Sequence, residues 1–333
     1  MSSAELWTVG RLLQWTADYL KGHGSESPRL DAEVLLAHVL GRQRIELYTT
    51  FDEAPGEEAR AAFRELVRRR AEGMPVAYLV GHREFYSLSF HVTPDVLIPR
   101  PETELLVVAV LDLIKQSHTS PLPLGNRQGA SNASPLPLGE GPGVSNSSPL
   151  PLGEGPGARA AEEVTIADVG TGSGAIAVCL AKHLPACRVT AIDVSRAALA
   201  VAVQNARQHE VAERIEFVES DLFAAISPQR QFHFIVSNPP YVTTAEMDGL
   251  AVDVRKFEPR VALVAGPRGT EVIEALVAQA AERLRPAGHL LMEISPTIHD
   301  AVRSLLQADD RFDVGPTIKD LARLPRVVQA RRK

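Results

Sequence analysis

The pattern of hydrophobic and polar positions first predicts helices. Residues 1–76 carry apolar residues at helical spacing, with Thr8 placed to cap a first helix and Ser27 and Pro28 to begin a second. Residues 83–98 instead alternate apolar and polar positions and are rich in Phe, Tyr and Val, which predicts a β-hairpin. We therefore expect a helical domain over residues 1–76 and a hairpin linker within residues 77–100.

The pattern changes again in the second half of the chain, where short apolar runs alternate with amphipathic stretches. This alternation predicts βαβ units and a parallel sheet covered by helices on both faces. The predicted fold class is α/β, a doubly wound and mostly parallel sheet with an antiparallel edge, over residues 101–333. A helix is expected over residues 102–116. Strands are expected over residues 164–169, 188–193, 214–219, 232–237 and 289–294, helices over 174–183, 195–209 and 270–284, and edge strands around 311–318 and 326–331.

Residues 117–162 differ in composition from the rest of the chain. They contain 8 Gly, 8 Pro and 7 Ser but no aromatic residue, and the motif SPLPLG begins at Ser120, Ser134 and Ser148. Each copy offers too few apolar side chains to bury in a stacked repeat. The segment is therefore predicted to be a disordered insert within the α/β domain, with Pro-rich recognition by a partner as the alternative.

Composition and charge narrow the functional classes. Hydrophobic residues make up 45% of the chain and the formal net charge is −6, so a core is available and no global basic field indicates nucleic-acid binding. The longest apolar runs are too short to span a membrane, and the N-terminus lacks a signal-peptide pattern. Cys179 and Cys187 lack metal-ligand spacing, so we expect a cytoplasmic protein with neither disulfide nor metal.

A glycine-rich loop after the first α/β strand is the first candidate for chemistry. Gly170, Gly172 and Gly174 lie between that strand and a helix, where they allow a tight turn and close approach of a ligand. Asp193 ends the second strand, where a carboxylate can accept both ribose hydroxyls of an adenine nucleoside. Because Gly170, Gly172 and Ala175 also fit the looser pattern of NAD-binding proteins, the loop alone does not decide the cofactor.

The tetrapeptide Asn238, Pro239, Pro240 and Tyr241 follows the strand predicted over residues 232–237, at the same edge of the sheet. The two prolines stiffen the turn and leave carbonyl oxygens free, and Asn238 adds a neutral acceptor. Tyr241 adds a flat ring with a polar tip. Two acceptors beside a ring are suited to holding a planar –NH2 group.

Together, the glycine loop, Asp193 and NPPY resemble class I S-adenosylmethionine-dependent methyltransferases that act on nitrogen. Three further blocks, REFY at 83–86, LIPRPETE at 97–104 and FEPR at 257–260, resemble the HemK/PrmC family of protein-(glutamine-N5) methyltransferases, which modify peptide chain release factors. The resemblance covers the chain outside residues 117–162. It departs after Glu293 and Ile294, where Ser295 and Pro296 replace the usual Gly and a nearby Gln is missing.

The resemblance implies methyl transfer from S-adenosyl-L-methionine to the amide nitrogen of the glutamine in the GGQ motif of release factors. Asn238 and the Pro239 carbonyl are then the catalytic acceptors of the two amide hydrogens, and residues 1–76 recognise the substrate protein. No metal, membrane or direct nucleic-acid partner is implied, and a monomer suffices. Implied cofactor-binding residues are Gly170, Thr171, Gly172, Ser173, Gly174, Asp193, Asp221, Leu222 and Asn238; implied substrate-binding residues are Asn238, Pro239, Pro240 and Tyr241.

Amide chemistry agrees with this residue set. The lone pair of an amide nitrogen is delocalised into the carbonyl group, so holding both hydrogens turns it towards the sulfonium methyl and stabilises developing positive charge. No strong base is needed, because the methylated cation is very acidic.

Other interpretations remain open at this stage. NPPY also occurs in N6-adenine DNA methyltransferases, so a DNA or RNA enzyme is the alternative, although residues 1–76 carry 10 Lys and Arg against 12 Asp and Glu. A non-catalytic adapter binding through the helical domain and the repeats is a second alternative. Arg100 and Glu102 could organise the wall of the site, or form a structural salt bridge between hairpin and sheet.

Overall fold

The computed structural model describes residues 6–119 and 163–333. The predicted insert lies outside these ranges except at its first three positions, which extend a helix, α6 (Glu104–Thr119), beyond its expected end at residue 116. The repeats themselves, at residues 120–162, are not described.

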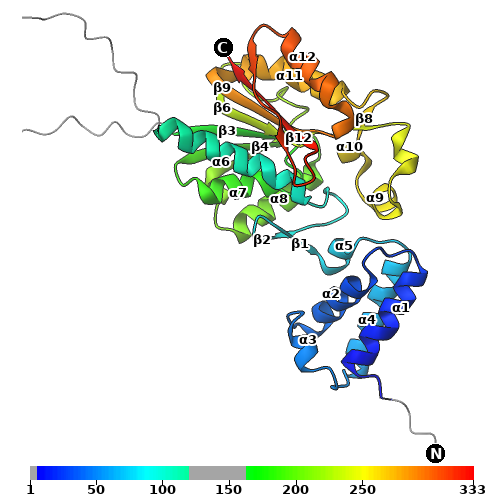
Figure 1. The fold of residues 1–333 in the computed structure, drawn as a ribbon. Coiled ribbons are helices and arrows are strands. Elements are labelled where there is room, and N and C mark those ends of the chain that lie inside the picture. The colour runs from blue at the N-terminus through cyan, green and yellow to red at the C-terminus, as the bar shows by residue number, and fades with distance from the viewer. Residues whose placement is uncertain (1–5, 120–162) are drawn as a thin grey trace, which may run out of the picture.

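Five helices, α1 to α5, form the N-terminal domain. This domain lies apart from the sheet (Figure 1). The Thr8 hydroxyl accepts a hydrogen bond from the Arg11 N–H at 3.3 Å and so begins the first helix as expected. The helices bury their apolar faces against one another around Leu13, Leu35 and Phe63. They are α1 (Val9–Gly22), α2 (Pro28–Leu40), α4 (Glu57–Ala71) and two short helices that periodicity did not predict, α3 (Glu46–Thr49) and α5 (Val76–Val80).

The hairpin is shorter than expected. It consists of β1 (His82–Phe85) and β2 (Leu88–His91), joined by Tyr86 and Ser87 at φ values of 50° and 59°. Residues 92–98 were predicted to continue it but form no strand. Their apolar side chains instead pack around Tyr78 and around Ala198 and Val201 of a later helix, so the alternation there reflects burial in a loop.

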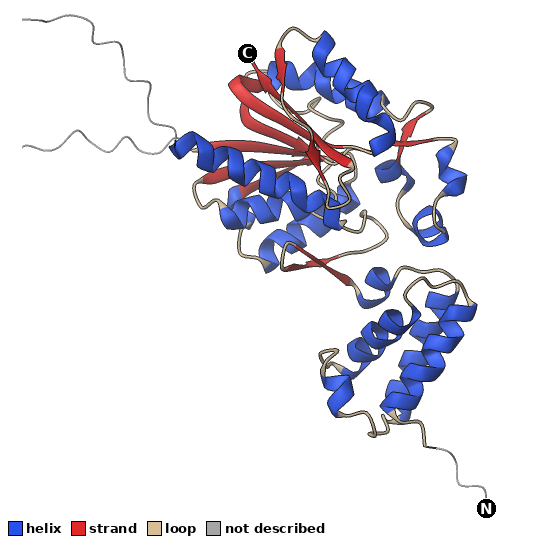
Figure 2. Ribbon diagram, viewed as in Figure 1, coloured by secondary structure: helices blue, strands red, loops and turns tan. Residues whose placement is uncertain are grey.

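One twisted sheet forms the centre of the second domain (Figure 2). Its order is β10-β12-β9-β6-β3-β4-β5, and β11 pairs with β12 at one edge. The strands from β9 to β5 run parallel, whereas β10, β11 and β12 are antiparallel to their neighbours. The predicted α/β class with an antiparallel edge is thus confirmed. The bounds are β3 (Val164–Val169), β4 (Cys187–Asp193), β5 (Ile215–Glu219), β6 (Phe232–Ser237), β9 (Leu284–Glu293), β10 (Phe312–Val314), β11 (Ile318–Lys319) and β12 (Pro325–Arg332).

Helices cover both faces of the sheet (Figure 1). On one face, α6, α7 (Ala175–His183) and α8 (Arg196–Gln208) bury a cluster that includes Ile166, Leu180 and Val236. On the other face, α11 (Glu271–Arg283) and α12 (His299–Ala308) bury a second cluster. The sequence analysis did not predict α12. Between β6 and α11 lie the short elements β7 (Val242–Thr243), α9 (Val252–Phe257), α10 (Arg260–Leu263) and β8 (Val264–Gly266). In the described ranges, no helix is both long and apolar enough to cross a membrane.

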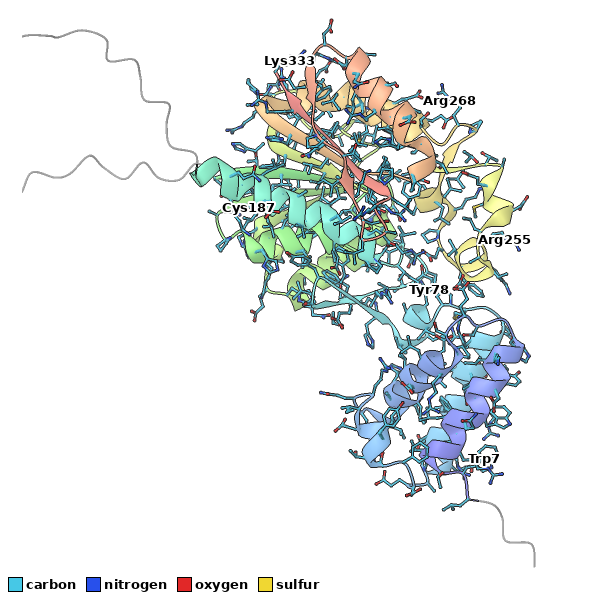
Figure 3. All side chains as sticks on the ribbon, viewed as in Figure 1. Trp7, Tyr78, Cys187, Arg255, Arg268 and Lys333 are labelled. Atoms are coloured by element: carbon cyan, nitrogen blue, oxygen red, sulfur yellow. The ribbon has the colours of Figure 1, made fainter. Side chains whose placement is uncertain are left out.

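Tyr78 lies where the helical domain meets the rest of the molecule (Figure 3). Its hydroxyl donates to the Val96 carbonyl at 2.7 Å, and burial raises the pKa of this phenol. Nearby, the Lys256 ammonium lies 3.4 Å from the Glu72 carbonyl oxygen, so α9 contacts the chain that leaves α4. The two domains are therefore joined by packing as well as by the hairpin.

Asn205 on α8 ties the hairpin to the glycine loop. The side chain is fully buried, and its Oδ1 accepts from the His91 N–H at 2.7 Å. Its Nδ2 donates to the carbonyls of His91 and Ser173 at 3.0 and 2.8 Å. One amide thus satisfies three backbone groups in two separate segments.

We expect Asn205→Ala to lower the free energy of unfolding by about 2–3 kcal/mol, because it leaves buried backbone groups without partners. Urea unfolding followed by circular dichroism measures this. Gln208→Ala on the same helix is the matched control: its amide makes one exposed bond, 2.8 Å, to the Ser89 carbonyl, and we expect a loss below about 1 kcal/mol. Equal losses of unfolding free energy in the two variants would contradict the proposed role of Asn205 in connecting the hairpin to the glycine loop.

Candidate active site

A cavity of about 350 Å³ opens at the carboxyl ends of the parallel strands. This is where ligands bind in open α/β sheets. The structure brings nine of the predicted site residues to its lining: Gly170, Thr171, Gly172, Ser173, Asp193, Asp221, Leu222, Asn238 and Pro240.

The glycine loop forms one wall of this cavity. The Gly170 and Thr171 N–H groups donate to the Ile192 carbonyl at 2.8 and 2.9 Å, which fixes the loop over the end of β4. Gly170, Gly172 and Gly174 have φ values of 73°, 55° and 79°, a conformation that disfavours residues with a Cβ. A Cβ at Gly174 would also lie 3.0 Å from the Cβ of Ala202, so this glycine allows α7 to pack closely on α8.

Asp168 holds the glycine loop in place through hydrogen bonds. Its fully buried Oδ2 accepts from the Thr171 hydroxyl at 2.7 Å and from the Ala177 N–H at 3.1 Å, whereas Oδ1 has no protein partner. Burial raises the pKa of this carboxyl to about 7 despite those two bonds. The sequence analysis did not give Asp168 a role, although its position at the end of the first strand, just before the loop, was visible.

Asp193 is already bound to the backbone on both of its carboxylate oxygens. Oδ2 accepts from the Gly172 N–H at 2.8 Å, and Oδ1 accepts from the Ser195 N–H at 2.9 Å. Burial raises its pKa, and these bonds oppose the rise. Because each oxygen has a further lone pair, both can accept from a vicinal diol while the carboxylate stays fixed.

Asp221 and Leu222 lie on the turn after β5, at the side of the cavity away from β6. Leu222 has φ 48°, a region that a branched side chain rarely occupies. The Ser220 N–H donates to the Asp193 carbonyl at 2.9 Å and so connects this turn to the end of β4.

Asn238 follows β6 directly and faces the glycine loop. Its Nδ2 donates to the Thr103 hydroxyl at 3.1 Å, which leaves Oδ1 as the free end of the amide. The Ser237 hydroxyl donates to the Val169 carbonyl at 2.6 Å, and this bond joins the end of β6 to the end of β3. The geometry thus provides an acceptor next to the loop.

Three predicted site residues do not line the cavity. Gly174 caps α7, and Pro239 lies between the two lining residues Asn238 and Pro240. The ring of Tyr241 was expected to form a wall, but it packs against the cluster under α11 and α12. Its hydroxyl lies 3.4 Å from the Glu293 carboxyl, and burial raises its pKa.

Comparison with known proteins identifies the family. Residues 11–81 match the model for the PrmC N-terminal domain, and residues 158–254 match that for the methyltransferase small domain. The release factor glutamine methyltransferase of Rhodopirellula baltica is 45% identical over 97% of this chain and 95% of its own length. That of Koribacter versatilis is 39% identical over 94% and 95%. The chain belongs to the release factor glutamine methyltransferase family.

The strands β3 to β6 and the glycine loop lie within the residues that match the methyltransferase small domain. Among solved structures, the hMettl16 catalytic domain is 16% identical, with a TM-score of 0.49, and covers 80% of this chain and 82% of that one. Among the described residues, no group of three or more His, Cys, Asp or Glu side chains is arranged to hold a metal ion.

The methyltransferase also contains an ion pair beside the cavity, between Arg100 of the 97–104 block, which lines the cavity, and Glu258 of the 257–260 block. Glu258 is buried, and its other oxygen accepts from the Ile98 N–H at 3.3 Å. Burial raises the pKa of Glu258, and the Arg100 guanidinium opposes this. Arg100 lines the cavity and also forms a salt bridge, so both roles left open for it have support; the salt bridge, however, reaches Glu258 and does not join the hairpin to the sheet. It joins two loops that line the site, and the sequence analysis had not paired these residues.

Asp168 gives the methyltransferase a specific dependence on pH. A carboxyl whose pKa is higher in the folded state than in the unfolded chain stabilises the fold at low pH, and this contribution is lost as pH rises towards 7. We therefore expect Asp168→Asn to gain stability relative to the wild type between about pH 4 and 7, by a few kcal/mol in total, and the difference to level off above that range. Urea unfolding of both proteins at each pH measures it. A difference that stays constant across the range would mean that Asp168 does not titrate there.

Proposed function

We propose that this protein transfers a methyl group from S-adenosyl-L-methionine to the side-chain amide nitrogen of the glutamine in the GGQ motif of peptide chain release factors. The observation that carries the proposal is identity of 45% to a release factor glutamine methyltransferase across nearly the whole chain. The placement of Asn238 beside the glycine loop supports it, because this puts an amide acceptor at the edge where a cofactor would lie.

We assign the cofactor to the cavity at the ends of β3, β4 and β5. The glycine loop accommodates close approach of a ligand, and Asp193 keeps one lone pair per oxygen for the ribose hydroxyls. Asp221 and Leu222 supply the turn on which the adenine lies. When bound, S-adenosylmethionine supplies an electrophilic methyl group on its sulfonium.

The chain's own residues then position the nucleophile. The Asn238 Oδ1 and the Pro239 carbonyl accept the two hydrogens of the substrate amide, and this turns the nitrogen lone pair towards the methyl group. The same acceptors stabilise the positive charge that develops on nitrogen. Pro240 and Tyr241 complete the substrate-binding turn. The protein thus contributes orientation and electrostatic stabilisation rather than a base.

We assign recognition of the release factor to the helical domain, residues 1–76. This domain exposes large apolar side chains at Leu6, Trp15, Ile45 and Tyr48, which are suited to contact with a protein. We further propose that the enzyme acts as a monomer in the cytoplasm, where its substrate protein is found.

The test is methyl transfer from labelled S-adenosylmethionine to purified release factor, with adenine-containing DNA and RNA duplexes as parallel substrates. We expect label in the release factor and none in nucleic acid. Replacing the GGQ glutamine by asparagine in the release factor should abolish labelling. Label in the nucleic acid would support an N6-adenine enzyme instead.

Asn238→Ala should reduce turnover about 100- to 1,000-fold, because it removes a preorganised acceptor at the reacting nitrogen. Calorimetry should show cofactor affinity within about threefold of the wild type, since Asp193 and the loop are intact. Gln307→Ala, which removes an exposed amide on α12, is the control and should retain wild-type turnover. Near-wild-type turnover by Asn238→Ala would contradict its assigned role.

Asp193→Ala should weaken binding of S-adenosylmethionine by about 1–3 kcal/mol, which corresponds to roughly 5- to 150-fold in Kd, because charge-assisted bonds to the ribose are lost. Asp193→Asn keeps an acceptor for the backbone and should lose less. Asp313→Ala, an exposed carboxylate on the edge strand β10, provides the control. Unchanged affinity in folded Asp193→Ala would rule out the ribose assignment.

A further inference from the structure

Glu293 is a buried carboxyl to which the proposed chemistry assigns no role. It ends β9 with 1% of its surface exposed, and its Oε2 has no hydrogen-bond partner. Because Ser237 pairs with Met292 in the β6–β9 ladder, the next positions, Asn238 and Glu293, leave the sheet side by side. Burying a carboxyl without a full set of hydrogen-bond partners costs folding free energy, so this group calls for an explanation.

Thr103 connects these two residues. Its hydroxyl oxygen accepts from Asn238 Nδ2 at 3.1 Å, and the same hydroxyl lowers the pKa of the Glu293 carboxyl beside it. A threonine hydroxyl has only one proton to donate. Because an ionised carboxylate can only accept, a charged Glu293 favours the hydroxyl rotamer that points its proton at the carboxylate, which leaves an oxygen lone pair for the Asn238 amide.

This arrangement sets which end of the Asn238 amide is free. Without an ionised Glu293 as its acceptor, the Thr103 hydroxyl could donate its proton to Asn238 Oδ1. The side-chain amide of Asn238 would then flip. Its NH2 group would then be the free end, and a donor would meet the donor hydrogens of the substrate amide. An amide held the wrong way round cannot accept them.

We infer that Glu293 is a positioning residue which, through Thr103, holds Asn238 with Oδ1 free to accept from the substrate amide. The inference rests on the proposed function, since it assumes an amide substrate at Asn238. It extends that function to the residue that ends β9. The inference also gives the Thr103 hydroxyl of the 97–104 block a role, since it accepts from Asn238.

The ionisation of Glu293 should make turnover depend on pH. Burial raises its pKa to about 7, and nearby Glu102 acts in the same direction, while the Thr103 hydroxyl, Arg326 on β12 and Tyr241 oppose the rise. The pKa values of Arg326 and Tyr241 are both raised, so neither group titrates near neutrality. When Glu293 is protonated it can donate to the Thr103 hydroxyl. The proton of that hydroxyl is then free to be donated to Asn238 Oδ1. We therefore expect kcat to rise with pH through about 7.

Three variants of the full chain test whether Glu293 acts on Asn238 through Thr103. Labelled methyl transfer to release factor is measured at saturating cofactor. Thr103→Val keeps the shape but removes the hydroxyl, and should lower kcat about 10- to 100-fold with the Kd for S-adenosylmethionine within about threefold. Thr103→Ser restores the hydroxyl and should return kcat to within about threefold of the wild type. Glu293→Gln cannot ionise, so its kcat should be flat between pH 6 and 8.5.

The outcomes separate the inference from the proposed function. No transfer by the unaltered chain overturns both. Wild-type transfer together with wild-type kcat in Thr103→Val, or an unchanged rise with pH in Glu293→Gln, overturns the role of Glu293 alone. Asp168→Asn should retain the rise of kcat with pH. If kcat no longer rose with pH in this variant, the titrating group would be Asp168 beneath the glycine loop and not Glu293. If Thr103→Val fails to fold, the pH profile of Glu293→Gln decides the question.

Discussion

The parallel pairing of β3 with β4 and with β6 is the constraint on which the site depends. Because β3 pairs in register with both neighbours, the glycine loop, Asp193 and Asn238 all leave the sheet at one edge. The Ser237 hydroxyl and the Val169 carbonyl join two of these strand ends directly. A shift of one residue in any pair would turn the inward side chains outward and separate these groups.

Loops from outside the sheet complete the site around this edge. The hairpin is fixed to α8 by Asn205, which also holds the glycine loop through the Ser173 carbonyl. The Arg100–Glu258 pair joins two further lining segments across the cavity. Folding of the second domain and formation of the site are therefore coupled, because the same buried polar bonds serve both.

Buried carboxyls recur around the cavity and have different partners. Asp168 and Glu293 are almost fully buried, and burial raises the pKa of each to about 7. Glu258 is also buried, but it forms an ion pair with the Arg100 guanidinium, which opposes the rise in its pKa. Asp168 is bonded to Thr171 of the glycine loop, Glu293 to Tyr241 of the NPPY turn, and Glu258 to Arg100 in the cavity lining. Such groups cost stability, and in this protein they orient the loops around a small cavity.

The sequence by itself determined the α/β class, the positions of the main strands along the chain and most of the residues at the carboxyl edge, because these depend on local periodicity and on motifs that follow strands directly. Blocks at 97–104 and 257–260 also indicated the family without any structure. Only the tertiary structure decided that Tyr241 turns towards Glu293, that the hairpin ends at His91, and that Arg100 pairs with Glu258. The hydrogen bond between Thr103 and Asn238 joins residues 135 positions apart, so no local pattern could reveal it. Contacts of this kind depend on how separate segments pack, which periodicity along one segment does not encode.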